Sequence, residues 1–131
     1  MIHSDGAARG NPGPAGAGAV LTTADGARVG EVSEYLGERT NNQAEYAALK
    51  LALLEAMKLG ARRVAIKADS ELMVKQLNGE YRVKNAGIKP LYSEIMAMLA
   101  KLEGWTAEHV RREYNKDADQ LANEAIDNHA L

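Results

Sequence analysis

Apolar and polar residues alternate along the opening of the chain in the manner of β-strands. Residues 1–5 are short enough for one strand, and residues 16–23 and 28–35 carry alternating or small apolar side chains. The last two segments flank Asp25-Gly26, and an Asp-Gly pair is a strong hairpin signal. The pattern therefore predicts three antiparallel strands, with the glycine- and proline-rich residues 6–16 as a loop between the first two.

The apolar spacing becomes helical after residue 40. Thr40 can supply the N-cap oxygen of a helix that passes through strong helix formers at 44–59 and stops at Gly60. The later elements are predicted to be a strand at 64–69, a helix at 70–78, a helix from Pro90 to about Leu102, a strand at 105–110 and a helix from Asn115 or Lys116 to about Asn128. We find no linker or repeat, so residues 1–131 are expected to form one α/β domain.

Two of the predicted strands end at an aspartate. Asp5 closes the first strand, and Asp69 closes the strand at 64–69. A helix that crosses between these strands predicts a parallel, right-handed connection. Open α/β sheets place their ligand crevice at the carboxyl ends of such strands, so Asp5 and Asp69 are expected to lie side by side.

Two further acids stand near the starts of helices, on or beside the face that turns toward the core. Glu45 shares a stripe with Ala48 and Leu49, and Asp119 comes one turn before Ala122. A buried carboxylate has to be paired, protonated or bound to a metal. The alternative is an acid that points to solvent and is favoured there by the helix dipole.

Composition narrows the class of protein. The chain has 131 residues, 46% of them hydrophobic, with one Trp and no Phe, which predicts a single aliphatic, alanine-rich core. A net charge of −2 gives no global positive field, and the absence of cysteine excludes disulfides and zinc-thiolate sites. Without an apolar signal core or a stretch near the roughly 20 apolar residues of a membrane span, we expect a cytoplasmic monomer with no membrane partner.

Four blocks of residues carry a resemblance to type 1 ribonuclease H over the whole chain. They are Asp5-Gly6 with 10–14, Thr40-Asn41-Asn42 with Glu45, Ala68-Asp69-Ser70, and 115–122 with Asp119. The resemblance implies the ribonuclease H-like fold, a five-stranded mixed sheet in the order 3-2-1-4-5 with helices on both faces. It also implies a catalytic and metal-binding site made by Asp5, Glu45, Asp69 and Asp119.

Clustered carboxylates give these four acids a shared chemistry. Mg²⁺ or Mn²⁺ takes oxygen ligands, and two such ions roughly 4 Å apart can promote hydrolysis of a phosphodiester. The resemblance implies that Asp5 bridges both ions, that Asp119 helps hold the ion that orients the water, and that Glu45 and Asp69 hold the ion near the leaving 3′-oxygen. It implies endonucleolytic cleavage of the RNA strand of an RNA/DNA hybrid to 5′-phosphate and 3′-hydroxyl products.

Proteins distinguish RNA from DNA chiefly by the 2′-hydroxyl, so the groups that bind the hybrid should be small and polar. The resemblance implies contacts with RNA from the backbone of Ala8, Arg9 and Gly10 and from the side chains of Asn11, Asn41 and Glu45, with Thr40 and Asn42 toward the DNA. Turn and cap chemistry is the alternative explanation of the asparagines.

The chain departs from the family pattern in two segments. Many members have a histidine in the loop that corresponds to 110–115, whereas this chain offers Arg112 and Glu113 as possible auxiliary residues. Arg112 cannot be a general base because it stays protonated. Residues 79–89 leave no room for an extra basic helix, so Arg82 and Lys84 are the candidates for a contact with DNA.

Two other functions stay open from the sequence. The same fold could cut double-stranded RNA or another nucleic acid, because fold does not fix function. A non-catalytic module that binds hybrids would be indicated by the loss of one of the four acids, and all four are present.

Overall fold

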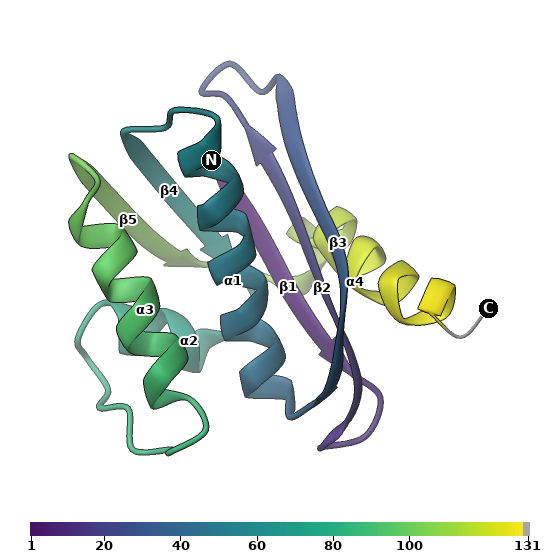
Figure 1. Cartoon of the computed structure of the whole chain (residues 1–131). Helices are drawn as coiled ribbons and strands as arrows, with labels where there is room; N and C mark the ends of the chain where they lie inside the picture. The colour runs from purple at the N-terminus through teal and green to yellow at the C-terminus, as the bar shows by residue number, and fades with distance from the viewer. Residues whose placement is uncertain (130–131) are drawn as a thin grey trace.

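A computed structural model describes residues 1–129 as one five-stranded mixed sheet with helices on both faces (Figure 1). The strands are β1 (Ile2–Ala8), β2 (Gly13–Thr22), β3 (Arg28–Arg39), β4 (Arg63–Ala68) and β5 (Gly104–His109). The helices are α1 (Asn41–Lys58), α2 (Glu71–Leu77), α3 (Lys89–Ala100) and α4 (Lys116–His129), with a short 3-10 helix η1 (Arg112–Tyr114). The strand order β3-β2-β1-β4-β5 is the predicted one.

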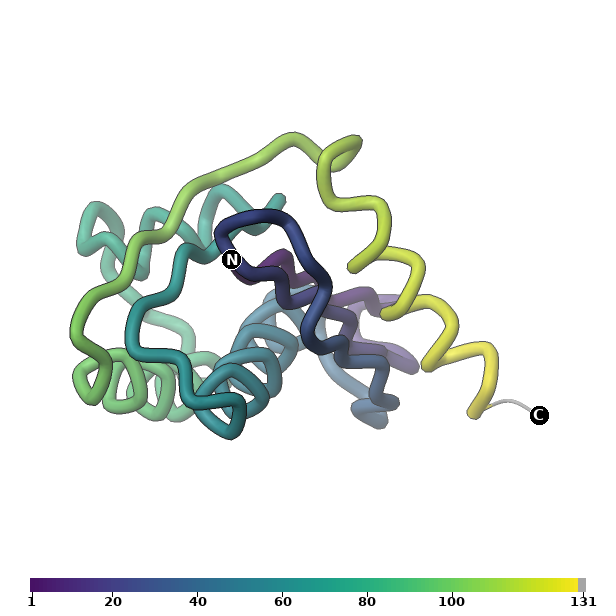
Figure 2. Tube along the Cα trace, turned by 90° about the horizontal axis from the view of Figure 1, so that it is seen from above, coloured from purple at the N-terminus to yellow at the C-terminus, as the bar shows by residue number. Residues whose placement is uncertain are grey.

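Helices α1 and α3 cover one face of the sheet, and α4 lies on the other (Figures 1 and 2). The α1 face holds the main core, where Leu49, Leu53, Ile66 and Ile95 are completely buried. Helix α2 adds further apolar side chains to the same core. Within residues 1–129, no helix is both long enough and apolar enough to span a membrane.

Strand β1 is central and pairs differently on its two sides. It is antiparallel to β2 along its whole length, from Ile2 opposite Leu21 to Ala8 opposite Ala15. It is parallel to β4 only as far as Ser4 opposite Ala68. The predicted hairpins and the predicted parallel crossover are thus confirmed, and β1 and β4 separate directly before Asp5 and Asp69.

The prediction of a loop over residues 6–16 is wrong for most of its length. Strand β1 continues to Ala8 and β2 begins at Gly13, so only residues 9–12 connect them. The glycines of this segment serve close packing: a Cβ on Gly16 would lie 2.2 Å from the carbonyl oxygen of Ala122 in α4. Asp5 therefore lies inside β1. The pairing of β1 with β4 ends directly before Asp5, whereas the pairing with β2 continues to Ala8. Strand β3 also extends to Arg39, four residues beyond the predicted end.

Candidate active site

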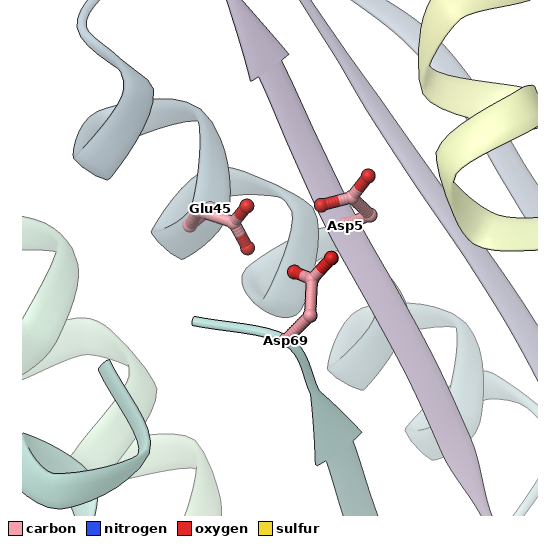
Figure 3. A group of neighbouring side chains, drawn as sticks. All are labelled: Asp5, Glu45 and Asp69. Carbon is pink, nitrogen blue, oxygen red and sulfur yellow. The ribbon is translucent and has the colours of Figure 1, made fainter. Parts of the chain in front are cut away.

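Three carboxylates meet where β1 and β4 separate. Asp5 comes from β1, Asp69 directly follows β4, and Glu45 lies in the first turns of α1 (Figure 3). Each offers a carboxylate oxygen, and these oxygens lie within 4.8 Å of one another. The expectation that Asp5 and Asp69 are neighbours is met, and Glu45 approaches the same point from the α1 face.

The start of α1 is fixed by a capping box. The hydroxyl of Thr40 accepts from the amide of Gln43 at 3.1 Å, and the Gln43 side chain accepts from the Thr40 amide at 3.0 Å. Gly6 lets the helix approach β1, since a Cβ there would lie 2.1 Å from the carbonyl carbon of Ala44. Glu45, the next residue, is thereby held beside Asp5.

The Glu45 carboxylate is turned inward, not toward solvent. Its Oε2 atom is buried and has no hydrogen-bond partner among the described residues. An ionised oxygen in such a place needs a cation or a proton. This unpartnered atom excludes the solvent-pointing alternative for Glu45 and fits a metal ligand.

Asp119 reaches the site from the opposite face of the sheet. Gly18, which pairs with Asp5, would place a Cβ 2.0 Å from the carbonyl oxygen of Ala118, so α4 rests almost directly on β2. Asp119 lies outside the group of three acids but lines the same hollow of about 440 Å³. The residues around this hollow are Asp5, Gly6, Ala7, Ala8, Asn41, Asn42, Glu45, Asp69, Ser70, Arg112, Asp119 and Asn123.

The electrostatics of the cluster favour a bound cation. Burial, with the nearby charge of Glu45, raises the pKa of Asp5 far above its usual range. Burial also raises the pKa of Glu45, and the charge of Asp69 adds to the shift. The Nε atom of Arg112 stands 3.8 Å from Oδ2 of Asp69, but its side chain is 87% exposed. Because a divalent cation stabilises the charged form of all these groups, an oxygen-rich site of this kind suits Mg²⁺ or Mn²⁺.

The predicted substrate-binding residues divide into two groups. Ala8, Asn41 and Asn42 line the hollow. Asn11 instead accepts a hydrogen bond from the amide of Asn41 at 3.0 Å, and the Thr40 hydroxyl is used by the capping box. The Asn11 side chain and the Thr40 hydroxyl therefore serve the turn and the helix cap, whereas Asn41 and Asn42 border the hollow that the acids line.

The remaining predicted residues lie at the margin of the site. The Arg9 side chain pairs with Asp127 at 2.5 Å, and Gly10 has a positive φ of 106° in the turn between β1 and β2. Neither borders the hollow. Of the two auxiliary candidates, Arg112 borders it, whereas Glu113 pairs with Arg111 at 3.6 Å.

Sequence reasoning missed Asn123, which lines the hollow beside Asp119. The available signal was its spacing, because residues four apart on a helix are neighbours on one face. It also missed the packing role of Gly6, since a glycine after a strand-borne aspartate looks like the start of a turn.

Comparisons with known proteins agree on the family. The family described as "Reverse transcriptase-like" matches residues 3–125. The "Ribonuclease H" of Anaplasma marginale is 34% identical over 135 residues, covering 92% of this chain and 86% of that protein. The structure of LC11-RNase H1 in complex with an RNA/DNA hybrid superposes with a TM-score of 0.95 at 41% identity and covers 99% of this chain and 98% of that one.

A longer relative is also similar to this chain. The "Bifunctional protein Rv2228c" of Mycobacterium tuberculosis is 44% identical over 128 residues, which cover 97% of this chain but 35% of that protein. The chain thus spans about a third of the length of this relative. The fold and the acidic site define a ribonuclease H-like protein. The similarity along nearly the whole chain shows that it belongs to the type 1 ribonuclease H family.

Proposed function

We propose that this protein is a metal-dependent endonuclease that hydrolyses the RNA strand of RNA/DNA hybrids. The observation that carries the proposal is the convergence of Asp5, Glu45 and Asp69, with a buried, unpartnered oxygen on Glu45. Membership of the ribonuclease H family and the hybrid bound to a protein of the same fold support the choice of substrate.

The four acids would hold two divalent cations, Mg²⁺ or Mn²⁺. Asp5, Glu45 and Asp69 provide one set of oxygens, and Asp119 approaches Asp5 from the other face of the sheet. When bound, the cations supply activation of the attacking water and stabilisation of the leaving 3′-oxygen, which yields 5′-phosphate and 3′-hydroxyl products. The protein keeps the acids close together at the cost of repulsion, so that the site is ready for cations.

Substrate selection is assigned to the small polar rim of the hollow. Asn41, Asn42 and the backbone at Ala8 border the acids and offer amide donors and carbonyl acceptors. Such groups can bind 2′-hydroxyls across a shallow minor groove. Arg112 contributes positive charge beside Asp69, and its role is electrostatic because it cannot accept a proton.

We assign this activity to a single domain that acts as a monomer. All residues that border the hollow come from this one chain, on its sheet, its helices and the segments that join them. No second chain is needed to complete the group of acids.

The test is cleavage of one end-labelled sequence prepared as an RNA/DNA hybrid, duplex RNA, duplex DNA and single-stranded RNA. Wild type is compared with Asp119→Asn and with Asp117→Asn, which makes the same charge change at an exposed position of the same helix. We expect cleavage of the hybrid only, with Mg²⁺ or Mn²⁺ and not with chelator, by wild type and Asp117→Asn. Preferred cleavage of duplex RNA would reassign the substrate, and binding of the hybrid without cleavage would make the chain a binding module.

A further inference from the structure

A line of polar side chains joins the turn between β1 and β2 to Asp119. Asn123, one turn after Asp119 on α4, donates from Nδ2 to the Asp119 carbonyl oxygen at 3.0 Å and to its Oδ1 atom at 3.4 Å. The Oδ1 atom of Asn123 accepts from Nη2 of Arg9 at 3.3 Å. Arg9 in turn donates from Nη1 to Asp127 at 2.5 Å.

The chemistry of the partners fixes which way the Asn123 amide points. An arginine side chain can only donate, so the oxygen of Asn123 has to face Arg9. The NH₂ group then faces Asp119, where both acceptors belong to one residue. If the amide were reversed, its NH₂ group would face the N–H donors of Arg9 and its oxygen would face the acceptor oxygens of Asp119.

The arrangement matters because Asp119 is the outlying acid. Its carboxylate lies outside the group formed by Asp5, Glu45 and Asp69, although it lines the same hollow. Asn123 also borders that hollow, next to the carboxylate it contacts. A donor at this place restrains the rotamer of Asp119, which lines the hollow where a cation would bind.

We propose that Asn123 is a positioning residue that orients the Asp119 carboxylate for metal binding, and that Arg9 holds the Asn123 amide in the required orientation. The inference rests on the proposed function, since it gives Asp119 a cation to bind. It also means that the Arg9 side chain binds residues of α4 and does not contact the nucleic acid. The exposed pair of Arg9 with Asp127 adds little stability, with side chains 46% and 62% exposed. Its role here is to fix geometry.

The experiment measures Mn²⁺ binding by isothermal titration calorimetry, alongside cleavage of the hybrid. The variants are Asn123→Ala, Arg9→Ala, Asp119→Ala and the double variant Asp119→Ala/Asn123→Ala. Gln120→Ala is the matched control, because it removes an exposed hydrogen bond to Glu124 on the same helix, away from the hollow. Circular dichroism confirms that each variant is folded.

Loss of groups that orient a metal ligand commonly weakens metal affinity by 10- to 100-fold, so we expect Asn123→Ala to weaken the Mn²⁺ affinity by about tenfold. Arg9→Ala should give a smaller loss, and Gln120→Ala none. In the Asp119→Ala background, Asn123→Ala should add no further loss, because Asn123 acts through Asp119. In the cleavage assay, Asn123→Ala should lower kcat at limiting Mn²⁺. The kcat should return toward the wild-type value at high Mn²⁺, and KM for the hybrid should be unchanged.

Wild-type Mn²⁺ affinity in a folded Asn123→Ala variant would overturn the inference, and so would an equal loss in the presence and absence of Asp119. If wild type cuts the hybrid while Asn123→Ala binds Mn²⁺ normally, the positioning role fails and the proposed function stands. If the affinities follow the expected pattern but no nucleic acid is cut, the proposed function fails and the positioning role stands. Absence of Mn²⁺ binding by wild type would overturn both.

Discussion

The two faces of the sheet hold their helices in different ways. On the α1 face, large side chains such as Leu49, Leu53 and Ile95 fill a thick core and are fully buried. On the α4 face, the glycines of β2 bring the strand backbone against the helix backbone, with the Cβ position of Gly18 only 2.0 Å from the Ala118 carbonyl oxygen. The sheet therefore holds α1 mainly through large apolar side chains, with a close backbone contact at Gly6, and holds α4 through close backbone contacts at Gly16 and Gly18.

This difference bears on the acids that each helix carries. Glu45 is carried by α1, which has a close backbone contact with β1 at Gly6 and is held elsewhere by buried apolar side chains. Asp119 is delivered by α4, whose close contact leaves no room for an added atom. We therefore expect stability to depend mainly on the α1 face, and the position of the fourth acid to depend on the glycines of β2.

The largest loss of stability is expected from Leu53→Ala on the α1 face. Leu53 is completely buried, and truncation of a buried leucine costs about 2–5 kcal/mol because it leaves a cavity. The neighbouring Leu54 is 47% exposed, so Leu54→Ala is the matched control and should cost far less. Urea denaturation measures both, and the folded Leu53→Ala protein should keep cleavage near the wild-type rate. A loss below about 1 kcal/mol would contradict the description of this face as the main core.

A smaller loss of stability but a larger loss of activity is expected from Gly18→Ala. The new methyl group collides with the Ala118 carbonyl oxygen, and such overpacking costs about 1–3 kcal/mol. The collision moves α4 and with it Asp119. Gly30→Ala in β3 is the control, because its methyl group would meet side-chain atoms at 3.4 Å or more. Cleavage by Gly18→Ala equal to that of Gly30→Ala, both measured on folded protein, would contradict the dependence of Asp119 on this contact.

The third effect is a pH dependence of stability, which arises from Asp5 and Glu45 in the candidate active site. Burial raises the pKa of Asp5 and of Glu45 in the folded chain above their values of about 4 in the unfolded chain. Between these values the folded chain binds more protons than the unfolded one, so the metal-free protein loses stability as the pH rises above about 4.

Asp5→Asn removes one of these ionisations. Between pH 4 and pH 7 with chelator, its free energy of unfolding should rise relative to wild type by at least about 1.4 kcal/mol, the equivalent of one pKa unit. Saturating Mg²⁺ should cancel the advantage, because the cation stabilises the folded wild type that binds it. Thermal denaturation at each pH measures the difference, and a difference that is constant with pH would contradict the raised pKa values.

The sequence predicted the strand order through a resemblance and the acids through their places on strands and helices. Asp5 and Asp69 could be found because strand ends of a parallel pair meet at one edge. The loop predicted over residues 6–16 failed because glycine serves both tight turns and close helix packing, and a local pattern does not distinguish them. Asn123 was missed because an asparagine inside a helix shows its role only when Arg9, distant along the chain, is seen beside it.

The most direct test of the central claim is hydrolysis of the RNA/DNA hybrid by Asp5→Asn, with hybrid binding measured on the same samples. Asparagine keeps the shape of the side chain and removes the carboxylate that Asp5 contributes to the group with Glu45 and Asp69. We predict that the variant binds the hybrid and, at saturating Mn²⁺, leaves it uncut, while wild type cleaves it. Cleavage by folded Asp5→Asn at a rate near that of wild type would contradict the assignment of these acids as the active site.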